Sequence, residues 1–376
     1  GVKNAVPQLL KLADALGAGI AKAVLAKTMV PDDAPGVTGT IGLLGTEPSD
    51  RMMRHCDTLL MVGTSFPYAE FLPASDQARA VQIDLDAANL GLRYPTEVNL
   101  HGDAGATLEA LLERITPKTD RAWRRDLEEQ IDDWWDTVAA RANTEADPLN
   151  PQKIFWELSP RLPDGALLAA DVGTATDWYA RFLKVTGNVQ GSTSGGLASM
   201  GNGVPYALAA KFAHPDRPVI ALVGDGAMQM IGNNGLITVA RYWREWADPR
   251  LVVLVLNNRD LNQVTWEQRV MEGDPKFESS QALPDFDYDQ YAEMLGLRGL
   301  RLDSAERVTE VLDAALAADR PVVINAVVDA NVPPLPTHLE MDQVKGYMES
   351  ILKGDPEAGP ELRQSLKAMA AKYLKR

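Results

Sequence analysis

Polar side chains follow two consecutive apolar runs of the sequence, at the points where each run ends. Residues 219–223 and 251–256 have the length and β-branching of buried strands, and the stretch between them is helical in pattern to about residue 246. Asp225 follows the first run, and Asn257 and Asn258 close the second. Open α/β sheets bind ligands at the carboxyl ends of their strands, so we expect these side chains to meet there.

The residues around Asp225 indicate what this edge could bind. Carboxylate and amide oxygens are hard donors that suit Mg²⁺, which usually keeps substrate phosphates among its ligands. Gly224 and Gly226 flank Asp225 and would let backbone N–H groups approach a phosphate at the start of a helix. The pattern therefore predicts a metal-bridged diphosphate site. The alternative is an ordinary strand–turn–helix connection in which Gly-Asp-Gly occurs by chance.

Composition limits the classes of function. The formal net charge of −15 argues against nucleic-acid binding through a broad basic face. Cys56 is the single cysteine, which excludes an internal disulfide framework and predicts a reducing, cytoplasmic location. The sequence has no run of eighteen apolar residues and no pattern of a signal peptide. Because it opens with Gly1 in place of methionine, we expect a fragment or a processed product.

Strands alternating with helices predict a parallel-sheet α/β domain in the first part of the chain. The expected strands are 18–25, 57–63, 78–86 and 98–102, the expected helices are 4–16, 50–55 and 104–115, and a Pro/Gly-rich loop is expected over 31–45. A charged helix over 120–142 and a linker over 143–152 would follow.

A second parallel-sheet α/β domain is predicted after the linker. Its expected strands are 166–171, 219–223, 251–256 and 321–328, its expected helices include 204–214, 287–295 and 305–318, and a Gly/Ser-rich loop is expected over 191–203. The predicted organisation is a central α/β domain over 1–118, a helix and linker over 119–150, a diphosphate-binding domain over 151–334, and a helical tail over 335–376.

Asp84 ends an expected strand of the first domain, where an acidic residue could hold the ribose of a nucleotide. The alternative is a strand-end carboxylate that caps the next turn. Small residues at Gly63-Thr64 and at 38–42 could let a cofactor approach, but the segment has no complete G-x-G-x-x-G fingerprint.

The Gly-Asp-Gly motif, a spacer of about thirty residues and the Asn-Asn pair together resemble the signature of thiamine diphosphate enzymes. Further stretches are similar to the pyruvate oxidase and acetolactate synthase family, and most of all to its ubiquinone-dependent pyruvate oxidases. These stretches are GVTGTIG (36–42), GTSFPYAEF (63–71), VQIDLD (81–86), DVGT (171–174), VPPLP (332–336) and KGY (345–347). SGGLASMG (194–201) is more similar to acetolactate synthase.

The resemblance implies a set of site residues. The metal ligands would be the carboxylate of Asp225, the amide of Asn258 and the backbone oxygen of Asp260. Residues that would hold thiamine diphosphate are Gly173, Thr174, Gly224, Gly226 and Ala227 at the phosphates, Met200 as the apolar wedge under the bent cofactor, and the carbonyl of Ala198 at the 4′-amino group. Taken alone, Met200 could equally be a core methionine.

The resemblance also implies a substrate pocket and a second cofactor. Gln263, Val264 and Glu267 would line the pocket, although Glu267 could instead be a solvated helix carboxylate. The residues that would contact FAD in the central domain are Gly39, Gly42, Gly63, Thr64 and Asp84.

The implied activity is Mg²⁺- and thiamine diphosphate-dependent decarboxylation of a 2-oxo acid such as pyruvate, with oxidative transfer through a flavin. An acetolactate synthase-like carboligase or a simple decarboxylase is the alternative within the enzymes, and a non-catalytic cofactor-binding scaffold is the alternative outside them. Relatives assemble as dimers or tetramers. They also carry an N-terminal pyrimidine-binding domain with the glutamate that starts catalysis, which we expect on another fragment or lost from this one.

The end of the chain has a basic amphipathic pattern. Leu362, Leu366, Met369, Tyr373 and Leu374 lie near one face of a helix that also carries several lysines and arginines. Such a helix could make a peripheral contact with the inner membrane surface. The alternative is a terminal helix that packs on its own domain.

Overall fold

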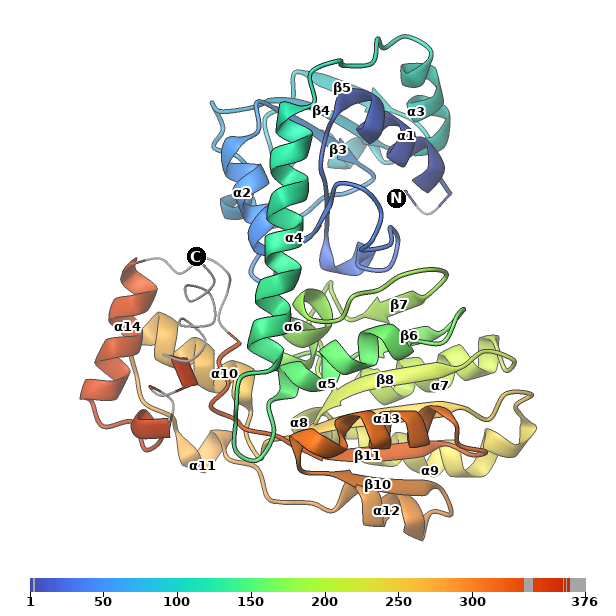
Figure 1. Ribbon diagram of the computed structural model, residues 1–376, viewed down its shortest axis with the longest axis vertical. Helices are drawn as coiled ribbons and strands as arrows, with labels where there is room; N and C mark the ends of the chain where they lie inside the picture. The colour runs from blue at the N-terminus through green and yellow to red at the C-terminus, as the bar shows by residue number, and fades with distance from the viewer. Residues whose placement is uncertain (3, 335–340, 361, 363, 366–376) are drawn as a thin grey trace. The chain divides into compact units, whose positions relative to one another are not determined.

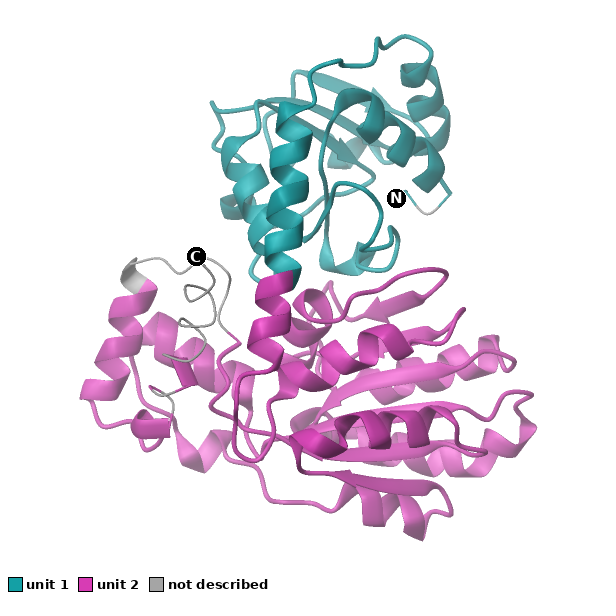
Figure 2. Cartoon of the chain, viewed as in Figure 1, with its two compact units in different colours: residues 1–135 teal, residues 136–376 magenta. Residues whose placement is uncertain are grey.

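The chain divides into two compact units, residues Gly1–Trp135 and Asp136–Arg376 (Figure 2). This computed structural model describes all residues except 3, 335–340, 361, 363 and 366–376. The division falls inside helix α4 (Ala122–Ala142), between the boundaries at 118 and 150 that the sequence suggested. Those two boundaries stay predictions, and each unit is described by itself below.

Unit 1 contains two small parallel sheets, ordered β1-β2 and β3-β4-β5 (Figure 1). Its elements are α1 (Val6–Leu16), β1 (Ile20–Lys22), β2 (Val37–Thr40), α2 (Glu47–His55), β3 (Thr58–Val62), β4 (Arg79–Asp84), β5 (Val98–His101) and α3 (Ala104–Leu112). The core between α1, α3 and the larger sheet includes Ile83 and Leu108, both fully buried. The parallel α/β class expected for this part of the chain is confirmed.

One expectation for unit 1 was wrong, because the stretch 31–45 is not all loop. It contains β2, which pairs in parallel with β1. The pattern hides this strand because it is short and carries Gly39 at φ +110°, where the methyl group of Thr46 fills the space of a side chain. Contacts distant in sequence, and not local β-propensity, therefore make this strand.

Unit 2 is built on a six-stranded, fully parallel sheet in the order β10-β11-β9-β8-β6-β7 (Figure 1). The strands are β6 (Leu167–Ala170), β7 (Gln190–Thr193), β8 (Val219–Gly224), β9 (Leu251–Asn257), β10 (Arg298–Leu302) and β11 (Val322–Val327). The main helices are α5 (Pro151–Leu158), α6 (Thr174–Arg181), α7 (Gly203–Ala213), α9 (Asn233–Tyr242), α10 (Asn262–Glu267), α12 (Tyr288–Met294) and α13 (Val308–Leu316).

Helices cover both faces of the large sheet. α7, α9 and α12 pack on one face, where the small or branched side chains of Ala221, Val223 and Val253 share a buried core with Leu236 of α9. α5, α6 and α13 lie on the other face. Because the central strands are covered on both sides, the sequences of β8 and β9 are nearly unbroken apolar runs, as is usual for strands of parallel sheets. This doubly covered sheet confirms the predicted fold class.

Several elements of unit 2 were not predicted from the sequence. Strands β7 and β10 form the two edges of the sheet and are only partly buried, so they lack a continuous apolar run. β7 lies at the start of the expected Gly/Ser-rich loop 191–203, which is therefore shorter than predicted. Helix α5 begins at Pro151, at the end of the expected linker, and α6 begins directly after Gly173.

After β11 the chain continues into α14 (Met341–Leu352), the only part of the expected tail whose helix is described over several turns. Leu366, Met369, Tyr373 and Leu374 of the amphipathic pattern lie outside the described residues. In the part of the chain that the structure describes, no helix combines the length and the apolar character needed to cross a membrane.

Candidate functional site

The buried carboxylate of Asp225 lies where β8 and β9 end side by side. Gly224 pairs with Leu256 across these strands, so Asp225 and the segment after Asn257 leave the same edge of the sheet. Asp225 Oδ1 accepts a hydrogen bond from the backbone N–H of Gly226 at 2.8 Å, and Oδ2 accepts one from Arg259 N at 2.6 Å. The carboxylate therefore ties the two strand ends together.

The environment of Asp225 suits a cation. Asp225 is 3% exposed, and burial raises its pKa to about 7, while hydrogen bonds from the backbone of Arg259, Gly226 and Asn258 oppose the shift. Burial penalises the ionised carboxylate, and a nearby divalent cation would favour it again. The donor set at this edge thus fits the hard-oxygen metal site that the sequence predicted.

The turn after β9 brings the other two expected metal ligands next to Asp225. Asn258 Oδ1 accepts a hydrogen bond from Asp260 N at 3.1 Å, and Arg259 between them has a left-handed backbone with φ +58°. The carboxylate of Asp260 faces Thr265 and Asn262, which donate to it at 3.0 and 3.1 Å. Its side chain is therefore used inside the protein, which agrees with an expected metal contact through the backbone oxygen only.

Within the described ranges, no three or more His, Cys, Asp and Glu side chains are grouped as metal ligands. The predicted site would use one carboxylate, one amide and one backbone oxygen. A cluster of acidic side chains is not needed for Mg²⁺, which takes the rest of its ligands from phosphates and water.

Two glycines leave open space at the strand edge beside Asp225. A Cβ atom built on Gly173 or on Gly224 would have no protein atom within 4 Å. β6 and β8 are neighbours and Asp171 N donates to Leu222 O at 2.8 Å, so the loops that follow these two strands leave the sheet together. Gly173 has φ +105° and ψ −161° at the start of α6, a conformation that only glycine adopts readily.

This open cradle fits a diphosphate. Helix starts favour anions because the first backbone N–H groups and the positive end of the helix dipole lie there, and α6 and the helical segment after β8 both begin at this edge. Thr174, Gly226 and Ala227 belong to the first residues of these segments. Unlike Gly224, Gly226 is closely packed, since a Cβ there would approach the side chains of Leu261 and Met200 at 2.7 and 3.6 Å.

The carboxylate of Asp171 holds the glycine-rich loop in place. It accepts hydrogen bonds from the N–H groups of Val172, Gly201 and Gly203 at 2.8, 2.8 and 2.6 Å. Burial raises the pKa of Asp171, and these backbone donors oppose that shift. No role of Asp171 was predicted from the sequence, because Gly201 and Gly203 lie about thirty residues further along the chain.

Met200 and Ala198 occupy the loop that Asp171 holds. Met200 is partly buried against the core under α7 and lies beside Gly226, so the structure brings these two expected cofactor residues together. Ala198 has a left-handed backbone with φ +50°, which is rare for a residue with a side chain. Backbone strain of this kind is most often found at ligand sites.

Helix α10 presents the expected substrate-pocket residues. Gln263 Nε2 donates to Glu267 Oε1 at 2.9 Å, and Val264 and Glu267 are exposed. Burial raises the pKa of Asp177 on α6 to about 7; Arg181 opposes the shift and the charge of Glu267 adds to it. The fully buried Asp177–Arg181 ion pair, with atoms 2.6 Å apart, therefore lies within electrostatic reach of α10.

Tyr288 is a further residue beside Asp225 that was not predicted from the sequence. Its hydroxyl donates to the backbone oxygen of Asp225 at 3.2 Å and accepts from Gln229 at 3.0 Å. The residue is fully buried in the core of unit 2. Tyr288 thus fixes the backbone of the residue whose side chain is the expected metal ligand.

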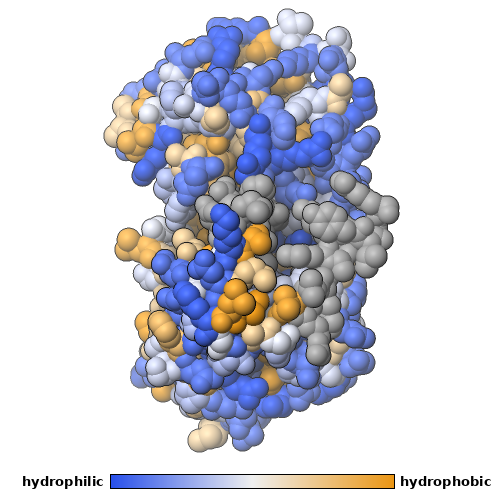
Figure 3. Space-filling view, turned by 90° about the vertical axis from the view of Figure 1, so that its left-hand side faces the viewer, coloured by the Kyte–Doolittle hydropathy of each residue, from blue (hydrophilic) through white to orange (hydrophobic). Residues whose placement is uncertain are grey.

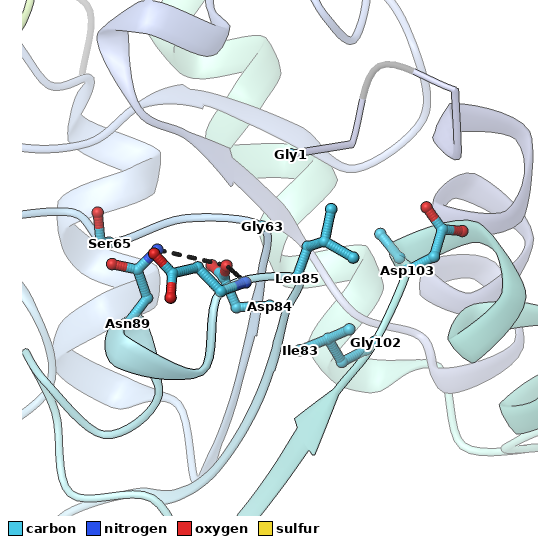
Figure 4. Close-up of a pocket in the computed structure, with 11 residues that line it drawn as sticks. Gly1, Gly63, Ser65, Ile83, Asp84, Leu85, Asn89, Gly102 and Asp103 are labelled. Atoms are coloured by element: carbon cyan, nitrogen blue, oxygen red, sulfur yellow. Dashed lines mark hydrogen bonds between the residues drawn. The ribbon is translucent and has the colours of Figure 1, made fainter.

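Unit 1 contains a separate cavity of about 450 Å³ at the carboxyl ends of β3, β4 and β5 (Figure 4). Gly63, Asp84 and Gly102 each follow or end one of these strands and line it. Asp84 Oδ1 accepts hydrogen bonds from Asp86 N at 2.9 Å and from Asn89 Nδ2 at 3.3 Å, drawn as dashed lines in Figure 4. A nucleotide ribose would meet carboxylate acceptors here.

The other expected flavin contacts do not line this cavity. Gly39 and Gly42 face protein side chains, because a Cβ at these positions would come within 2.5 Å of Thr46 and 3.0 Å of Phe66. Thr64 is not among the lining residues, whereas its neighbour Ser65 is. The structure therefore brings together Gly63 and Asp84 and leaves Gly39, Gly42 and Thr64 outside this cavity.

Comparison with known proteins agrees with this geometry. Residues 1–111 match the central domain of thiamine pyrophosphate enzymes, and residues 171–326 match their C-terminal TPP-binding domain. The chain is 36% identical over 373 residues to YdaP of Bacillus subtilis, whose name describes a thiamine pyrophosphate-containing protein; the match covers 98% of this chain and 63% of YdaP.

Two enzymes are among the further relatives. A pyruvate oxidase of Lactiplantibacillus plantarum is 26% identical, with 91% of this chain and 56% of the enzyme covered. An acetolactate synthase of Mycobacterium leprae is 29% identical, with 87% of this chain and 53% of the enzyme covered. The chain thus spans somewhat more than half the length of the curated relatives that it matches.

The fold and site are those of a parallel-sheet α/β protein with open space beside a buried carboxylate at the edge of the sheet. The chain belongs to the thiamine pyrophosphate enzyme family, of which it carries the central and the TPP-binding domains. The family predicted from the Gly-Asp-Gly and Asn-Asn motifs is confirmed.

Proposed function

We propose that this chain binds thiamine diphosphate through Mg²⁺ at the edge of the unit 2 sheet. Asp225, the amide of Asn258 and the backbone oxygen of Asp260 would hold the metal. Gly173, Thr174, Gly224, Gly226 and Ala227 would surround the phosphates, with Met200 and the Ala198 carbonyl at the organic part of the cofactor. The observation that carries the proposal is the open space at Gly173 and Gly224 beside the buried carboxylate of Asp225.

We further propose that the protein containing this chain decarboxylates a 2-oxo acid such as pyruvate. The bound cofactor would supply the carbon nucleophile and electron sink for this reaction. Gln263, Val264 and Glu267 on α10 would line the substrate pocket, where the hydrogen bond between Gln263 and Glu267 fixes the carboxylate position. The similarity to a pyruvate oxidase and to acetolactate synthases supports this substrate class.

The fate of the two-carbon product distinguishes oxidase from carboligase. A flavin bound at Gly63 and Asp84 in unit 1 would favour oxidation to acetate, and the cavity of about 450 Å³ there supports such a ligand. The acetolactate synthase-like stretch 194–201 favours carboligation as the second candidate. We propose the oxidative reaction, because the cavity offers a place for the flavin that would accept the electrons.

Binding and turnover require separate experiments. We expect calorimetric titration of the chain with thiamine diphosphate to show binding with Mg²⁺ present and little without it, and Asp225→Asn to weaken it at least tenfold. Equal binding by the Asn variant, at equal thermal stability, would contradict the metal assignment. For the protein that contains this chain we expect turnover of pyruvate, and the product, acetate, acetolactate or acetaldehyde, identifies the reaction.

A further inference from the structure

A series of buried and partly buried charges connects the turn after β9 (residues 258–260, called the metal turn below) with the C-terminal segment of unit 2. Asp260 belongs to the turn after β9, Arg269 and Lys276 follow α10, and Asp355 and Glu357 come after α14. These groups are joined by ion pairs with atom separations between 2.8 and 3.1 Å. Nothing in the proposed binding of the cofactor requires charged residues so far along the chain, so the series calls for an explanation of its own.

Two side-chain and two backbone hydrogen bonds hold the carboxylate of Asp355. Arg269 donates to both carboxylate oxygens, from Nε and from Nη2, at 2.8 Å each, and both side chains are fully buried. The backbone N–H groups of Lys276 and Glu357 donate to the same carboxylate at 2.9 Å each. Asp355 therefore fixes the backbone of Lys276 as well as the C-terminal segment.

The ammonium group of Lys276 lies between two carboxylates. Its Nζ is 3.1 Å from Asp260 Oδ1 and 3.0 Å from Glu357 Oε1, and the side chain is 6% exposed. The side chain of Asp260 is 1% exposed. Lys276 therefore fixes the position of the buried Asp260 side chain, and Glu357 fixes the position of the ammonium group from the other side.

Asp260 also determines the geometry of the metal turn. Its carboxylate accepts from Asn262 and Thr265 at the start of α10, and its backbone N–H donates to the amide oxygen of Asn258. The backbone bridge between Asp260 and Ala282 fixes the other side of the turn. A change in the position of the Asp260 side chain would therefore move the amide and the backbone oxygen that are expected to bind the metal.

The attachment of the C-terminal segment does not depend on Lys276 alone. Tyr347 of α14 stacks on Trp266 with ring centroids 6.0 Å apart, and Gly346 lies so close to Val270 that a Cβ would come within 2.4 Å of its backbone oxygen. Because of these two contacts, the segment would remain packed if Lys276 were replaced. The opposite side of α14 exposes Met348 and Leu352, and Figure 3 shows apolar side chains between hydrophilic ones on the side of the molecule to which α14 belongs.

We propose that Lys276 is a positioning residue for the metal turn formed by Asn258 and Asp260, and that Asp355 and Glu357 hold Lys276 in place. The C-terminal segment thereby becomes part of the support of the cofactor site. This inference rests on the proposed function, because the turn has a metal to hold only if thiamine diphosphate binds there.

The test compares Lys276→Met with Lys353→Met. Lys353 is half exposed and pairs with Asp274 at 2.8 Å on the same segment, so its replacement removes a lysine without touching the turn. Two quantities are measured: hydrogen exchange of the peptide covering residues 258–265 in metal-free protein, and the affinity for Mn²⁺ in the presence of thiamine diphosphate, followed by electron paramagnetic resonance. Thermal melts confirm that each variant is folded.

We expect Lys276→Met to speed exchange in 258–265 at least tenfold and to weaken Mn²⁺ binding at least tenfold, while Lys353→Met matches the wild type in both. If Lys276→Met does not fold, Glu357→Gln serves instead and should change both quantities about threefold in the same direction. Unchanged exchange or unchanged Mn²⁺ affinity in a folded variant overturns the proposal. If the wild type itself binds no Mn²⁺ with the cofactor, the proposed function fails, and this role of Lys276 fails with it even where exchange rises.

Discussion

Replacing Gly224 by alanine should weaken the binding of thiamine diphosphate without lowering the stability of the fold. Gly224 has φ −82° and ψ 157°, a conformation that alanine adopts without strain, and the added methyl group would meet no protein atom within 4 Å. A compatible Gly→Ala change usually stabilises a protein by about 0.4 to 1 kcal/mol, because the unfolded chain loses freedom. We therefore expect the melting temperature of Gly224→Ala to equal or slightly exceed that of the wild type.

The same methyl group should weaken the binding of the diphosphate, because it occupies part of the space that the phosphates would need. The space that it enters is the cradle in which the phosphates would lie, and adding a methyl group to a filled site usually costs about 1 to 3 kcal/mol. At 1.4 kcal/mol for each factor of ten, the dissociation constant for thiamine diphosphate with Mg²⁺ should rise about 5- to 150-fold. Isothermal titration calorimetry on both proteins measures this ratio directly.

Two further alanine variants serve as controls. Gly359 is exposed, and a Cβ there would also meet nothing within 4 Å, so Gly359→Ala should bind the cofactor as the wild type does. Gly173→Ala adds backbone strain of about 1 to 3 kcal/mol at φ +105° and should lose stability as well as affinity. Wild-type affinity in Gly224→Ala, or a large loss of its stability, would refute the assignment of this space to the diphosphate.

Two more predictions concern buried charges away from the cofactor site. In unit 1, Asp32 binds the ammonium groups of Lys22 and Lys27 at 2.7 Å each, so Asp32→Asn should lower the free energy of unfolding by about 3 to 5 kcal/mol in urea titrations; a loss below about 1 kcal/mol would contradict this. In unit 2, burial lowers the pKa of Lys211 to about 8. The folded state therefore favours the neutral amine, and the wild type should gain stability relative to Lys211→Met as the pH rises from about 8 to 10.5. A difference in stability between the two proteins that does not change with pH would contradict this second prediction.

The central strands of the unit 2 sheet could be predicted from the sequence, whereas its edge strands could not. β8 and β9 are buried on both faces, so their apolar runs identified them, and the polar residues at their ends indicated the site. The edge strands β7 and β10 carry no such run, because each is paired on one side only and most of its residues are only partly buried. Periodicity could therefore not identify them, and the neighbouring strand in the sheet defines them instead.

Residues that support the site from a distance could not be predicted from local patterns. Asp171 binds backbone groups of Gly201 and Gly203, and Lys276 binds Asp260 and a carboxylate about eighty residues further along the chain. Single aspartates and lysines of this kind resemble solvated surface residues in any sequence. Only the folded structure shows that their side chains are buried and which groups they hold.

Backbone strain occurs in both of the loops that the resemblance assigned to the cofactor. Among the residues that the structure describes, Ala198 and Arg259 are the non-glycine residues with a left-handed backbone, and each belongs to one of these loops. Such a conformation costs about 1 to 2 kcal/mol for a residue with a side chain, so it persists only where neighbouring contacts enforce it. Arg259 N is held by the carboxylate of Asp225, and Ala198 N by the carbonyl of Ser194. The strain therefore lies where a cofactor would need a fixed carbonyl and a fixed metal turn, and alanine and arginine give no sign of it in the sequence.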